Sequence, residues 1–336
     1  TTCPICVPAR ASLMTGRYVH QTGHWDNAFP YTGTPAGWSH RLRAQGIHVD
    51  SIGKLHFRGN DDNGFVDEIE PLHVVDGVGD LLGCEREDPP VRDKRPGLRE
   101  AGPGDSTYLR YDARNADNAV RWLAAHANDE EPWVLFLSFV CPHPPYIAPP
   151  ALFEHYAALD LPPRPQHETD EWPHHPAIAY FRHFFTLNEP LAEETWQRVA
   201  AAYYGVCTYL DTQIGRVLDE LAATGLIDNT RVVYTADHGE ALGARGLSGK
   251  FTLYDESASV PLIVAGPDVP RGKTVTTPVS LVDMYPTILE AAGVPLLPSE
   301  HDLPGQSLWS LAASADAERT VFAEYHALGS HAGSYM

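Results

Sequence analysis

A cysteine near the beginning of the sequence stands where a helix is expected to start. Cys6 precedes Pro8 and Arg10 in the run Cys-Val-Pro-Ala-Arg. A proline in the first turn favours a helix start at this point. The free N–H groups and the dipole of a helix amino end stabilise a developing anion, and Arg10 can add a fixed positive charge there. This pattern predicts that Cys6 is a nucleophile or the precursor of one.

The same cysteine also belongs to a second pattern, because Cys3-Pro-Ile-Cys6 is a CxxC motif. That spacing occurs in redox-active pairs and in half of many zinc sites. No second CxxC follows, and the sequence shows no strand before this one, as a thioredoxin-like motif would require. On the residues alone, a non-hydrolytic redox or zinc-binding protein built on Cys3 and Cys6 stays open.

The charge balance limits the partners of the chain. It carries 24 Lys and Arg against 44 Asp and Glu, a formal charge of -20. This argues against nucleic acid as a partner, because phosphate binding needs a basic stripe that the sequence lacks. An anionic small molecule would be repelled overall, so its site must concentrate positive charge locally. The sequence has four lysines that could contribute: Lys54, Lys94, Lys250 and Lys273.

The apolar runs and the cysteines indicate whether the chain spans a membrane and in which compartment it is found. The longest apolar run, residues 133–141, has the length of a strand, far below the roughly 18 residues of a membrane span. Five widely spaced cysteines do not resemble a disulfide framework, which favours a reducing compartment. We therefore expect no membrane span and a cytoplasmic protein.

Helix and strand patterns alternate along most of the chain, which is typical of an α/β fold with a mostly parallel central sheet and helices on both faces. Ser280 is expected to cap the last helix. The expected helices are residues 8–15, 38–45, 111–127, 193–224 and 281–292. The expected strands are residues 47–52, 133–140, 231–236 and 260–265, and continuous apolar runs predict that the last three are fully buried.

The segment 142–191 is rich in Pro, His and aromatic residues and shows little periodicity. Long irregular segments inside a domain are usually lids or binding loops, so we expect this one to wall a substrate pocket. Its aromatic residues, with Trp25, Tyr108 and Tyr146, could form a cage for a quaternary ammonium group. Packing in the core or at a rim accounts for them equally simply and is the favoured interpretation.

The run from Cys6 to Arg10 resembles the signature of a known protein family. Cys6-Val-Pro-Ala-Arg10 followed by Ala-Ser-Leu-Met-Thr-Gly is similar to that of the type I sulfatases, whose Cys is oxidised to formylglycine. This family belongs to the alkaline-phosphatase-like superfamily, and the resemblance extends over essentially the whole chain. Ala9 departs from the family's usual Ser, a difference that the maturation enzyme is expected to accept.

The lysine and asparagine motifs match the same family. Gly53-Lys54-Leu55-His56 is similar to a segment in which the Lys binds sulfate and the His contacts formylglycine. Asn27, in Trp25-Asp26-Asn27, resembles the choline sulfatase and phosphonate monoester hydrolase branch, where it helps to hold the transferring group. Lys250 matches the second sulfate-binding lysine. The resemblance thus implies a substrate site of Asn27, Lys54 and Lys250.

The remaining motifs follow expected strands, at the edge where open α/β sheets build their sites. His143, in Cys-Pro-His-Pro-Pro, matches a histidine that protonates the leaving group. Asp237 and His238 match a pair of metal ligands, to which the group formed from Cys6 is added. Catalysis is thus expected from Cys6, Arg10, His56 and His143.

The resemblance implies hydrolysis of sulfate esters by a formylglycine nucleophile and one divalent cation: Ca²⁺, Mn²⁺ or Mg²⁺. Oxygen ligands favour hard cations. At the position of His238 the family more often carries an amide side chain, and the imidazole favours Mn²⁺ among the three ions. A phosphonate monoester or phosphodiester hydrolase with the same nucleophile is the alternative. The implied partners are a small-molecule sulfate ester and a formylglycine-generating enzyme, and a homo-oligomer is allowed.

The resemblance also bears on domain organisation. Residues 1–336 are expected to form a single sulfatase-like catalytic domain. A paired-Asp element that the family places before Cys6 is not in the sequence, and the family's C-terminal portion would begin near residues 321–326. We therefore expect a fragment without the N-terminal metal-binding strand and the smaller C-terminal sheet region.

Overall fold

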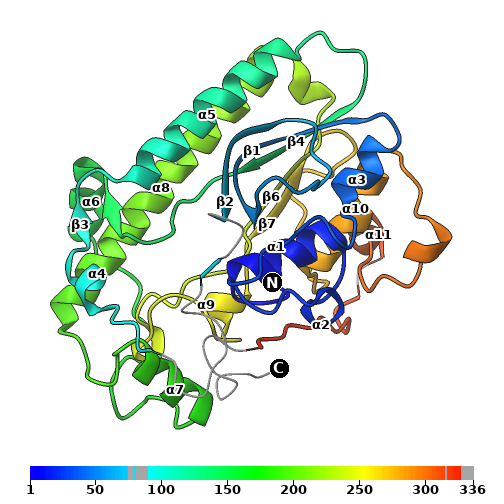
Figure 1. Ribbon diagram of the computed structural model, residues 1–336. Coiled ribbons are helices and arrows are strands. Elements are labelled where there is room, and N and C mark those ends of the chain that lie inside the picture. The colour runs from blue at the N-terminus through cyan, green and yellow to red at the C-terminus, as the bar shows by residue number, and fades with distance from the viewer. Residues whose placement is uncertain (75–78, 81–89, 315, 327–336) are drawn as a thin grey trace.

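The computed structural model describes residues 1–336 apart from 75–78, 81–89, 315 and 327–336 (Figure 1). A three-stranded parallel sheet has the order β2-β1-β4. Its strands are β1 (His48–Arg58), β2 (Glu68–Val74) and β4 (Trp133–Ser138). β1 runs in register with β4 from the pair His48 and Trp133 to the pair Gly53 and Ser138. The two strands therefore start side by side and run in the same direction, and β1 continues beyond the end of β4.

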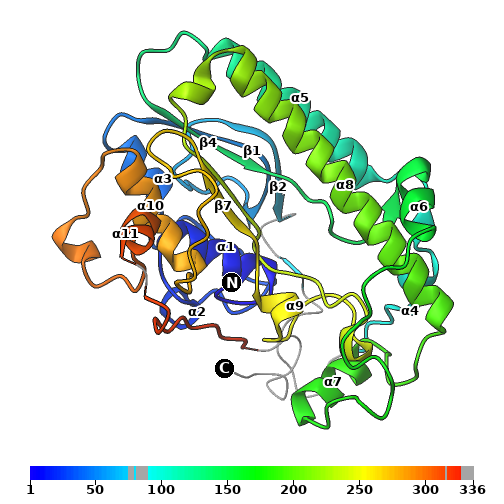
Figure 2. The ribbon, with the colours of Figure 1, turned by 180° about the vertical axis from the view of Figure 1, so that it is seen from behind.

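Helices cover both faces of this sheet, as the α/β pattern predicts (Figures 1 and 2). On one face, α5 (Thr107–Ala125) and the long helix α8 (Glu193–Ala223) lie side by side and pack on Ile52, Leu135 and Leu137. Because side chains alternate along a strand, Val134 and Phe136 of β4 point the other way.

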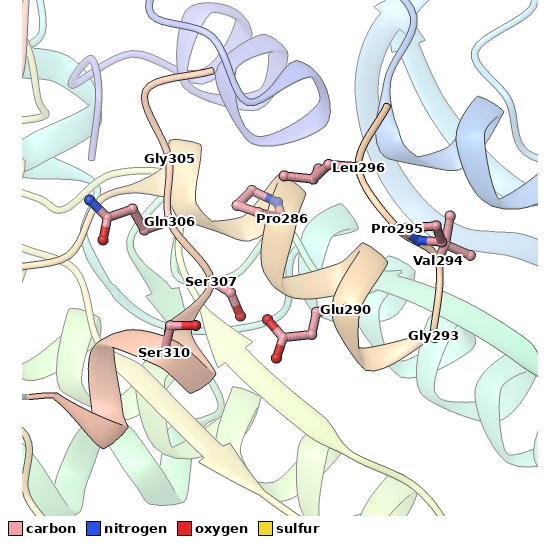
Figure 3. Close-up of a pocket in the computed structure, with 10 residues that line it drawn as sticks. All are labelled: Pro286, Glu290, Gly293, Val294, Pro295, Leu296, Gly305, Gln306, Ser307 and Ser310. Carbon is pink, nitrogen blue, oxygen red and sulfur yellow. The ribbon is translucent and has the colours of Figure 1, made fainter. Parts of the chain in front are cut away.

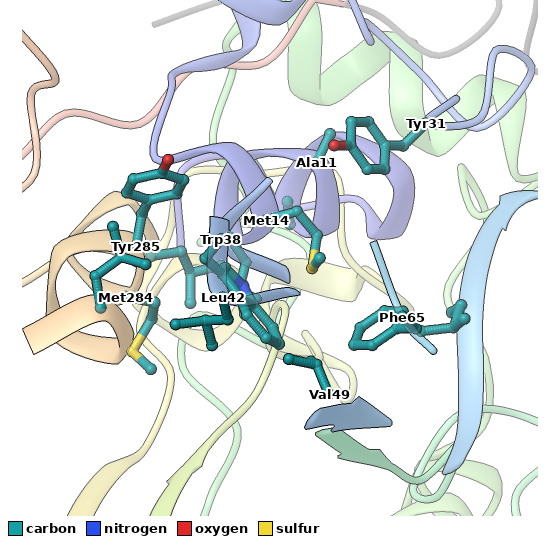
Figure 4. Close-up of a cluster of buried hydrophobic side chains, with 14 of the residues drawn as sticks. Ala11, Met14, Tyr31, Trp38, Leu42, Val49, Phe65, Met284 and Tyr285 are labelled. Carbon is teal, nitrogen blue, oxygen red and sulfur yellow. The ribbon is translucent and has the colours of Figure 1, made fainter. Parts of the chain in front are cut away.

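The opposite face is covered by three helices: α1 (Cys6–Thr15), α3 (Trp38–Arg43) and α10 (Met284–Ala291). Their apolar side chains form the cluster in Figure 4, with Trp38 and Leu42 fully buried at its centre. α1 is buried along its whole length and ends at Gly16, whose φ of 67° is left-handed and suits glycine. A fully buried helix is held firmly, which fixes the direction of the side chains at its amino end.

The strands β6 (Val232–Thr235) and β7 (Leu262–Ala265) form a separate antiparallel pair. The prediction of full burial is wrong for β4, β6 and β7, whose residues are mostly half-buried. Within the described residues, β4 has one neighbouring strand, β1, and β6 has only β7. A continuous apolar run shows that both faces of a strand pack, but it does not show that both edges are paired.

The expected helices exist with shifted boundaries. α5 begins at Thr107 rather than 111, because the Ser106 hydroxyl accepts a hydrogen bond from the Leu109 N–H and caps the helix earlier. The last expected helix is split into a 3₁₀ turn, Leu281–Asp283, and α10. At that turn the Ser280 N–H donates to the Asp283 carboxylate over 2.7 Å.

Residues 142–191 are more regular than their sequence predicts. They contain β5 (Ile147–Ala148), α6 (Pro150–Ala157) and α7 (Pro176–Phe184). α6 packs on α8, and α7 buries Phe181 and Phe184 in a core cluster with Phe251. Pro150 and Pro176 lie in the first turn of these two helices, so two of the prolines that suggested a loop mark helix beginnings instead.

The remaining short elements connect these layers. They are α2 (Val19–Thr22), α4 (Arg95–Arg99), β3 (Gly102–Pro103), α9 (Asp255–Ala258), α11 (Leu308–Ala313) and the 3₁₀ turns Leu226–Asp228, Ala244–Gly246 and Pro298–Glu300. β3 pairs with β5 in parallel. None of the helices in the described part of the chain is long and apolar enough to cross a bilayer.

Candidate active site

The amino end of α1 lies where chemically active side chains from four separate segments meet. The Cys6 Sγ is 3.1 Å from the Lys250 Nζ and 3.1 Å from the His238 Nε2. The Lys54 Nζ is 3.7 Å from the same sulfur. Residues separated by up to 244 positions in the sequence therefore converge on one atom, as the motifs predict.

These neighbours determine the ionisation of the cysteine. Burial by itself would raise the pKa of the Cys6 thiol, since Cys6 is 1% exposed. The charges of Lys250, Lys54 and His238 outweigh that effect and hold the pKa well below its ordinary value. The site thus stabilises negative charge at the position of Sγ, although the protein as a whole is strongly acidic.

Arg10 faces its own partners rather than the sulfur. Its Nε donates to the Asp237 Oδ2 over 2.8 Å, and its Nη1 donates to the Lys54 carbonyl over 2.8 Å and the Ser138 Oγ over 3.0 Å. One guanidinium therefore joins α1, β1, β4 and the end of β6. The prediction placed a fixed charge near Cys6, and the structure adds that this charge holds the site together.

Asp237 and His238 follow β6 and face the same point. The Nδ1 of His238 is 2.9 Å from the Gly239 carbonyl and donates to it, which turns Nε2 toward Cys6. Burial opposes ionisation of Asp237, but the charges of His238 and Arg10 prevail and lower the pKa of its carboxyl. Both side chains thus direct a potential ligand atom to the same position, and His238 would bind a metal through Nε2 in its neutral form.

Cys6, Asp237 and His238 form a group whose ligand atoms all lie within 4.8 Å of one another. An ionised carboxylate and an imidazole with its other nitrogen bonded to a carbonyl fit a divalent cation. A hard cation takes about six or more ligands, mainly oxygens. These three residues can supply part of that set, which leaves positions for substrate and water.

His143 lies in the loop after β4. Its Nδ1 is 2.8 Å from the Pro144 carbonyl, and its ring meets Tyr108 edge-on at 5.8 Å. Burial, with the nearby charges of Lys250 and Lys54, lowers the pKa of His143 to about 3. The ring is therefore neutral near pH 7, and Nε2 is its unprotonated nitrogen.

His56 and Asn27 were also predicted at this site. His56 has a left-handed φ of 62° inside β1, and its Nδ1 is buried without a hydrogen-bond partner among the described residues. Such a backbone costs about 1–3 kcal/mol in a non-glycine residue and is often kept at functional sites. The Asn27 Oδ1 accepts from the Val7 N–H over 2.9 Å, so Asn27 caps the buried start of α1 beside Cys6.

Two carboxylates that position the site were missed in the sequence. Asp112 of α5 is fully buried and accepts from the N–H groups of Val140 and Cys141, which fixes the loop that carries His143. Glu240 accepts from the Gly249 N–H over 2.5 Å and so fixes the residue before Lys250. An acidic residue on the buried face of an amphipathic helix would have been the signal for Asp112.

Cys3 is not part of this arrangement. It is fully buried, and burial raises the pKa of its thiol well above the ordinary value. Cys3 and Cys6 are both free thiols. Among the described residues, the group that could hold a metal with Cys6 contains Asp237 and His238 and not Cys3. The geometry therefore gives no support to a redox or zinc pair on the CxxC motif.

A cavity of about 550 Å³ lies elsewhere, beside α10 and α11 (Figure 3). Its lining is mainly Pro, Gly, Val, Leu and Ser, with Glu290 as its charged residue. None of the predicted site residues lines it. Without a nucleophile or convergent charges, this cavity offers no chemistry to compare with that around Cys6.

The structure is thus an α/β fold that concentrates positive charge around a thiol at the start of a buried helix. The model of the sulfatase family matches residues 1–294, and the chain belongs to that family. The resemblance seen in the motifs is confirmed, as is the α/β fold.

Curated relatives and solved structures agree with this assignment. The chain is 32% identical over 356 residues to choline-sulfatase of Rhizobium meliloti (strain 1021), covering 99% of this chain and 67% of the relative. It is 30% identical to arylsulfatase K of Danio rerio, covering 100% and 65%. A phosphonate monoester hydrolase from Silicibacter pomeroyi superposes with a TM-score of 0.71 at 25% identity, covering 95% and 70%. The chain thus spans about two thirds of the length of these relatives.

Proposed function

We propose that the chain hydrolyses a small-molecule sulfate ester, with Cys6 oxidised to formylglycine as the nucleophile. The observation that carries the proposal is the convergence of Lys250, Lys54 and His238 within 3.7 Å of the Cys6 sulfur at the start of a buried helix. This is the charge distribution that an anionic, tetrahedral group needs in an otherwise acidic protein. The family and the two sulfatase relatives support the same reaction.

Formylglycine explains why a cysteine stands here rather than a serine nucleophile. A hydrated aldehyde carries two hydroxyls on one carbon, so one oxygen can attack sulfur while the other remains. The ester formed in that attack breaks when the second hydroxyl loses its proton, for which His56 is the proposed acceptor. The aldehyde then reforms as the carbon–oxygen bond to sulfate breaks, and no water needs to attack the ester.

Lys54 and Lys250 are proposed to bind the sulfate oxygens, with Asn27 beside them. His143 is proposed to protonate the departing alkoxide. In the free protein His143 is neutral, because burial and the two lysine charges lower the pKa. A bound sulfate ester would offset those charges and raise the pKa, so substrate binding itself would prepare the acid.

A divalent cation is proposed at Asp237, His238 and the group derived from Cys6. When bound, it would polarise a substrate oxygen and favour the ionised nucleophile. Ca²⁺, Mg²⁺ and Mn²⁺ all accept the carboxylate, and the imidazole suits Mn²⁺ best of the three.

A phosphonate monoester or phosphodiester hydrolase is the second candidate. The observation that favours it is the structural similarity to the phosphonate monoester hydrolase, at 25% identity. The two ester types share tetrahedral geometry, so the same cradle could serve both. Parallel measurements of kcat/KM on a nitrophenyl sulfate and a phenyl phosphonate ester would decide, and a higher value for the phosphonate would reject the sulfatase proposal.

Residues 142–191 are proposed to wall the pocket. The segment carries His143, and its Phe185 ring packs on Phe251 at 5.0 Å, next to Lys250. Tyr146, Phe181 and Phe185 are buried in the core, so they are not offered as a cage for a cationic leaving group.

The modification at Cys6 can be tested directly by peptide mass spectrometry. Conversion of the thiol to the aldehyde lowers the peptide mass by about 18 Da. We expect this loss when the chain is made together with a formylglycine-generating enzyme, and no ester hydrolysis by Cys6→Ala. A fully active preparation in which Cys6 is an unmodified, alkylatable thiol would refute the mechanism.

A further inference from the structure

A second cluster of potential metal ligands lies at the opposite end of β1 from Cys6. The ligand atoms of His48, Asp50 and His126 all lie within 4.8 Å of one another. His48 is the first residue of β1, while Lys54 lies six residues further along it. At about 3.3 Å per residue, roughly 20 Å of strand separate the two clusters. The residues of this cluster therefore have no part in the proposed hydrolysis.

The carboxylate of the cluster is buried and fixed. Asp50 is 2% exposed, and its Oδ1 accepts from the Asp67 N–H over 3.0 Å. Its Oδ2 accepts from the Trp122 Nε1–H over 2.8 Å and lies 2.8 Å from the His48 Nε2. A carboxylate held in this way presents one oxygen to the cluster at a fixed position.

The second histidine is also oriented from outside the cluster. The His126 Nδ1 is 2.7 Å from the Trp122 carbonyl and donates to it, and the ring stacks on the Trp122 indole at 3.8 Å. The Nε2 is therefore the nitrogen with a free lone pair. An imidazole whose other nitrogen is bonded to a carbonyl is the usual arrangement of a metal-ligating histidine.

The surroundings favour a cation. His126 is the C-cap of α5, a helix of 19 residues, whose carboxyl end carries partial negative charge. A hollow of about 340 Å³ opens onto the cluster, and three acidic residues line it: Asp129, Glu130 and Glu131. The site is thus open to solvent on one side, where water or one of these carboxylates could complete a coordination shell.

We propose that His48, Asp50 and His126 bind a divalent transition-metal ion of the zinc class. Two imidazoles and a carboxylate suit such ions, whereas Ca²⁺ and Mg²⁺ prefer oxygen alone. A tetrahedral ion with bonds of about 2.1 Å needs ligand atoms about 3.4 Å apart. Rotation of the half-exposed His48 ring would open its 2.8 Å gap to Asp50 to that distance. The ion would tie the end of α5 to the start of β1.

The test is zinc binding by the whole chain, first freed of metals and then equilibrated with Zn²⁺ in excess Ca²⁺. Five proteins are compared: the parent, His48→Asn/His126→Asn, His126→Asn, the exposed-histidine control His155→Asn, and His238→Asn. We expect the double variant to lose one equivalent of zinc, and His155→Asn and His238→Asn to keep that equivalent. His126→Asn alone should weaken binding at least tenfold.

A thermal readout separates binding from general damage. At 100 times the Kd, Zn²⁺ should raise the Tm of the parent and of His238→Asn by a few degrees, and leave the Tm of the double variant unchanged. The double variant without metal should melt close to the parent, since both histidines are partly exposed. Equal zinc content in the parent and the double variant, or no zinc retained by the parent, would overturn the proposal.

Discussion

Arg10 offers the sharpest test of how the active site is held together. Its guanidinium is bonded to the Asp237 carboxylate, the Lys54 carbonyl and the Ser138 hydroxyl, and the two charged side chains are only 11% and 16% exposed. Arg10→Met would leave Asp237 as a buried carboxylate without its cation. Breaking a buried pair in this way costs about 3–5 kcal/mol, and we expect the free energy of unfolding to fall by that amount.

The measurement is urea unfolding in the presence of a chelator, so that no cation compensates Asp237. Asp237→Asn should cost less, about 1–3 kcal/mol, because Arg10 keeps two neutral acceptors. The double variant Arg10→Met/Asp237→Asn should lose less free energy of unfolding than the two single variants lose together, and the difference should be at least about 1.5 kcal/mol. Arg43→Met is the matched control, since Arg43 pairs with Asp62 at the surface and should cost under about 1 kcal/mol.

The pH dependence has a defined sign. The pKa of Asp237 is lowered in the folded protein, because His238 and Arg10 outweigh the opposing effect of burial. The carboxylate therefore stabilises the fold above the unfolded pKa of about 4, and this contribution is lost as the pH falls further. The stability gap between parent and Arg10→Met should shrink as the pH falls through the pKa of Asp237 in the folded variant, which lies above that of the parent because burial is no longer offset by Arg10, and it should be constant above that pKa. This account of Arg10 would be refuted if Arg10→Met lowered the free energy of unfolding by less than about 1 kcal/mol. It would also be refuted if the loss in the double variant equalled the sum of the losses in the two single variants.

Three further outcomes are expected. Lys250→Met should raise the pKa of the unmodified Cys6 thiol, seen as a shift of the alkylation rate profile to higher pH, while Lys273→Met should leave the profile unchanged. Inorganic sulfate should raise the pKa of His143 above its value of about 3 in the free protein, which the pH titration of its NMR signal would report; a titration unaffected by sulfate would contradict the proposed role as acid. Glu240→Met should weaken sulfate binding about tenfold, since the Leu242 and Gly249 N–H groups lose the acceptor that fixes the loop before Lys250, whereas Glu240→Gln, which keeps an acceptor oxygen, should bind sulfate more like the parent; sulfate binding by Glu240→Met equal to that of the parent would show that Glu240 does not position Lys250.

The sequence predicts the reacting groups better than the groups that position them. Cys6, Lys54, His238 and Lys250 stand in short motifs whose residue types already indicate chemistry, and the structure brings them together. Asp112 stands in no such motif; its only signal is its place on the buried face of an amphipathic helix, and one carboxylate on a helix is ordinarily at the surface. Its role depends on two N–H groups nearly thirty positions away, and such contacts are set by the tertiary fold.

The predictions about the fold that were wrong failed for a similar reason. The runs 133–140 and 231–236 are apolar because both faces of β4 and β6 pack against helices, and that part was predicted. Burial also depends on which strands lie alongside, and this pairing leaves no mark in the run itself. The helices within 142–191 were missed because prolines at a first turn and prolines in a loop look the same without their context.

The two proposed metal sites change how a metal analysis of this protein should be interpreted. β1 carries Lys54 of the active site near one end and His48 of the histidine cluster at the other. Asp237 with His238 suits Ca²⁺, Mg²⁺ or Mn²⁺, whereas two imidazoles with Asp50 suit zinc. Zinc is retained strongly by imidazole ligands, so it could be the metal found after purification even where a hard cation supports hydrolysis. The catalytic metal is therefore identified only by the ion that restores activity to a protein whose His48 and His126 have been replaced.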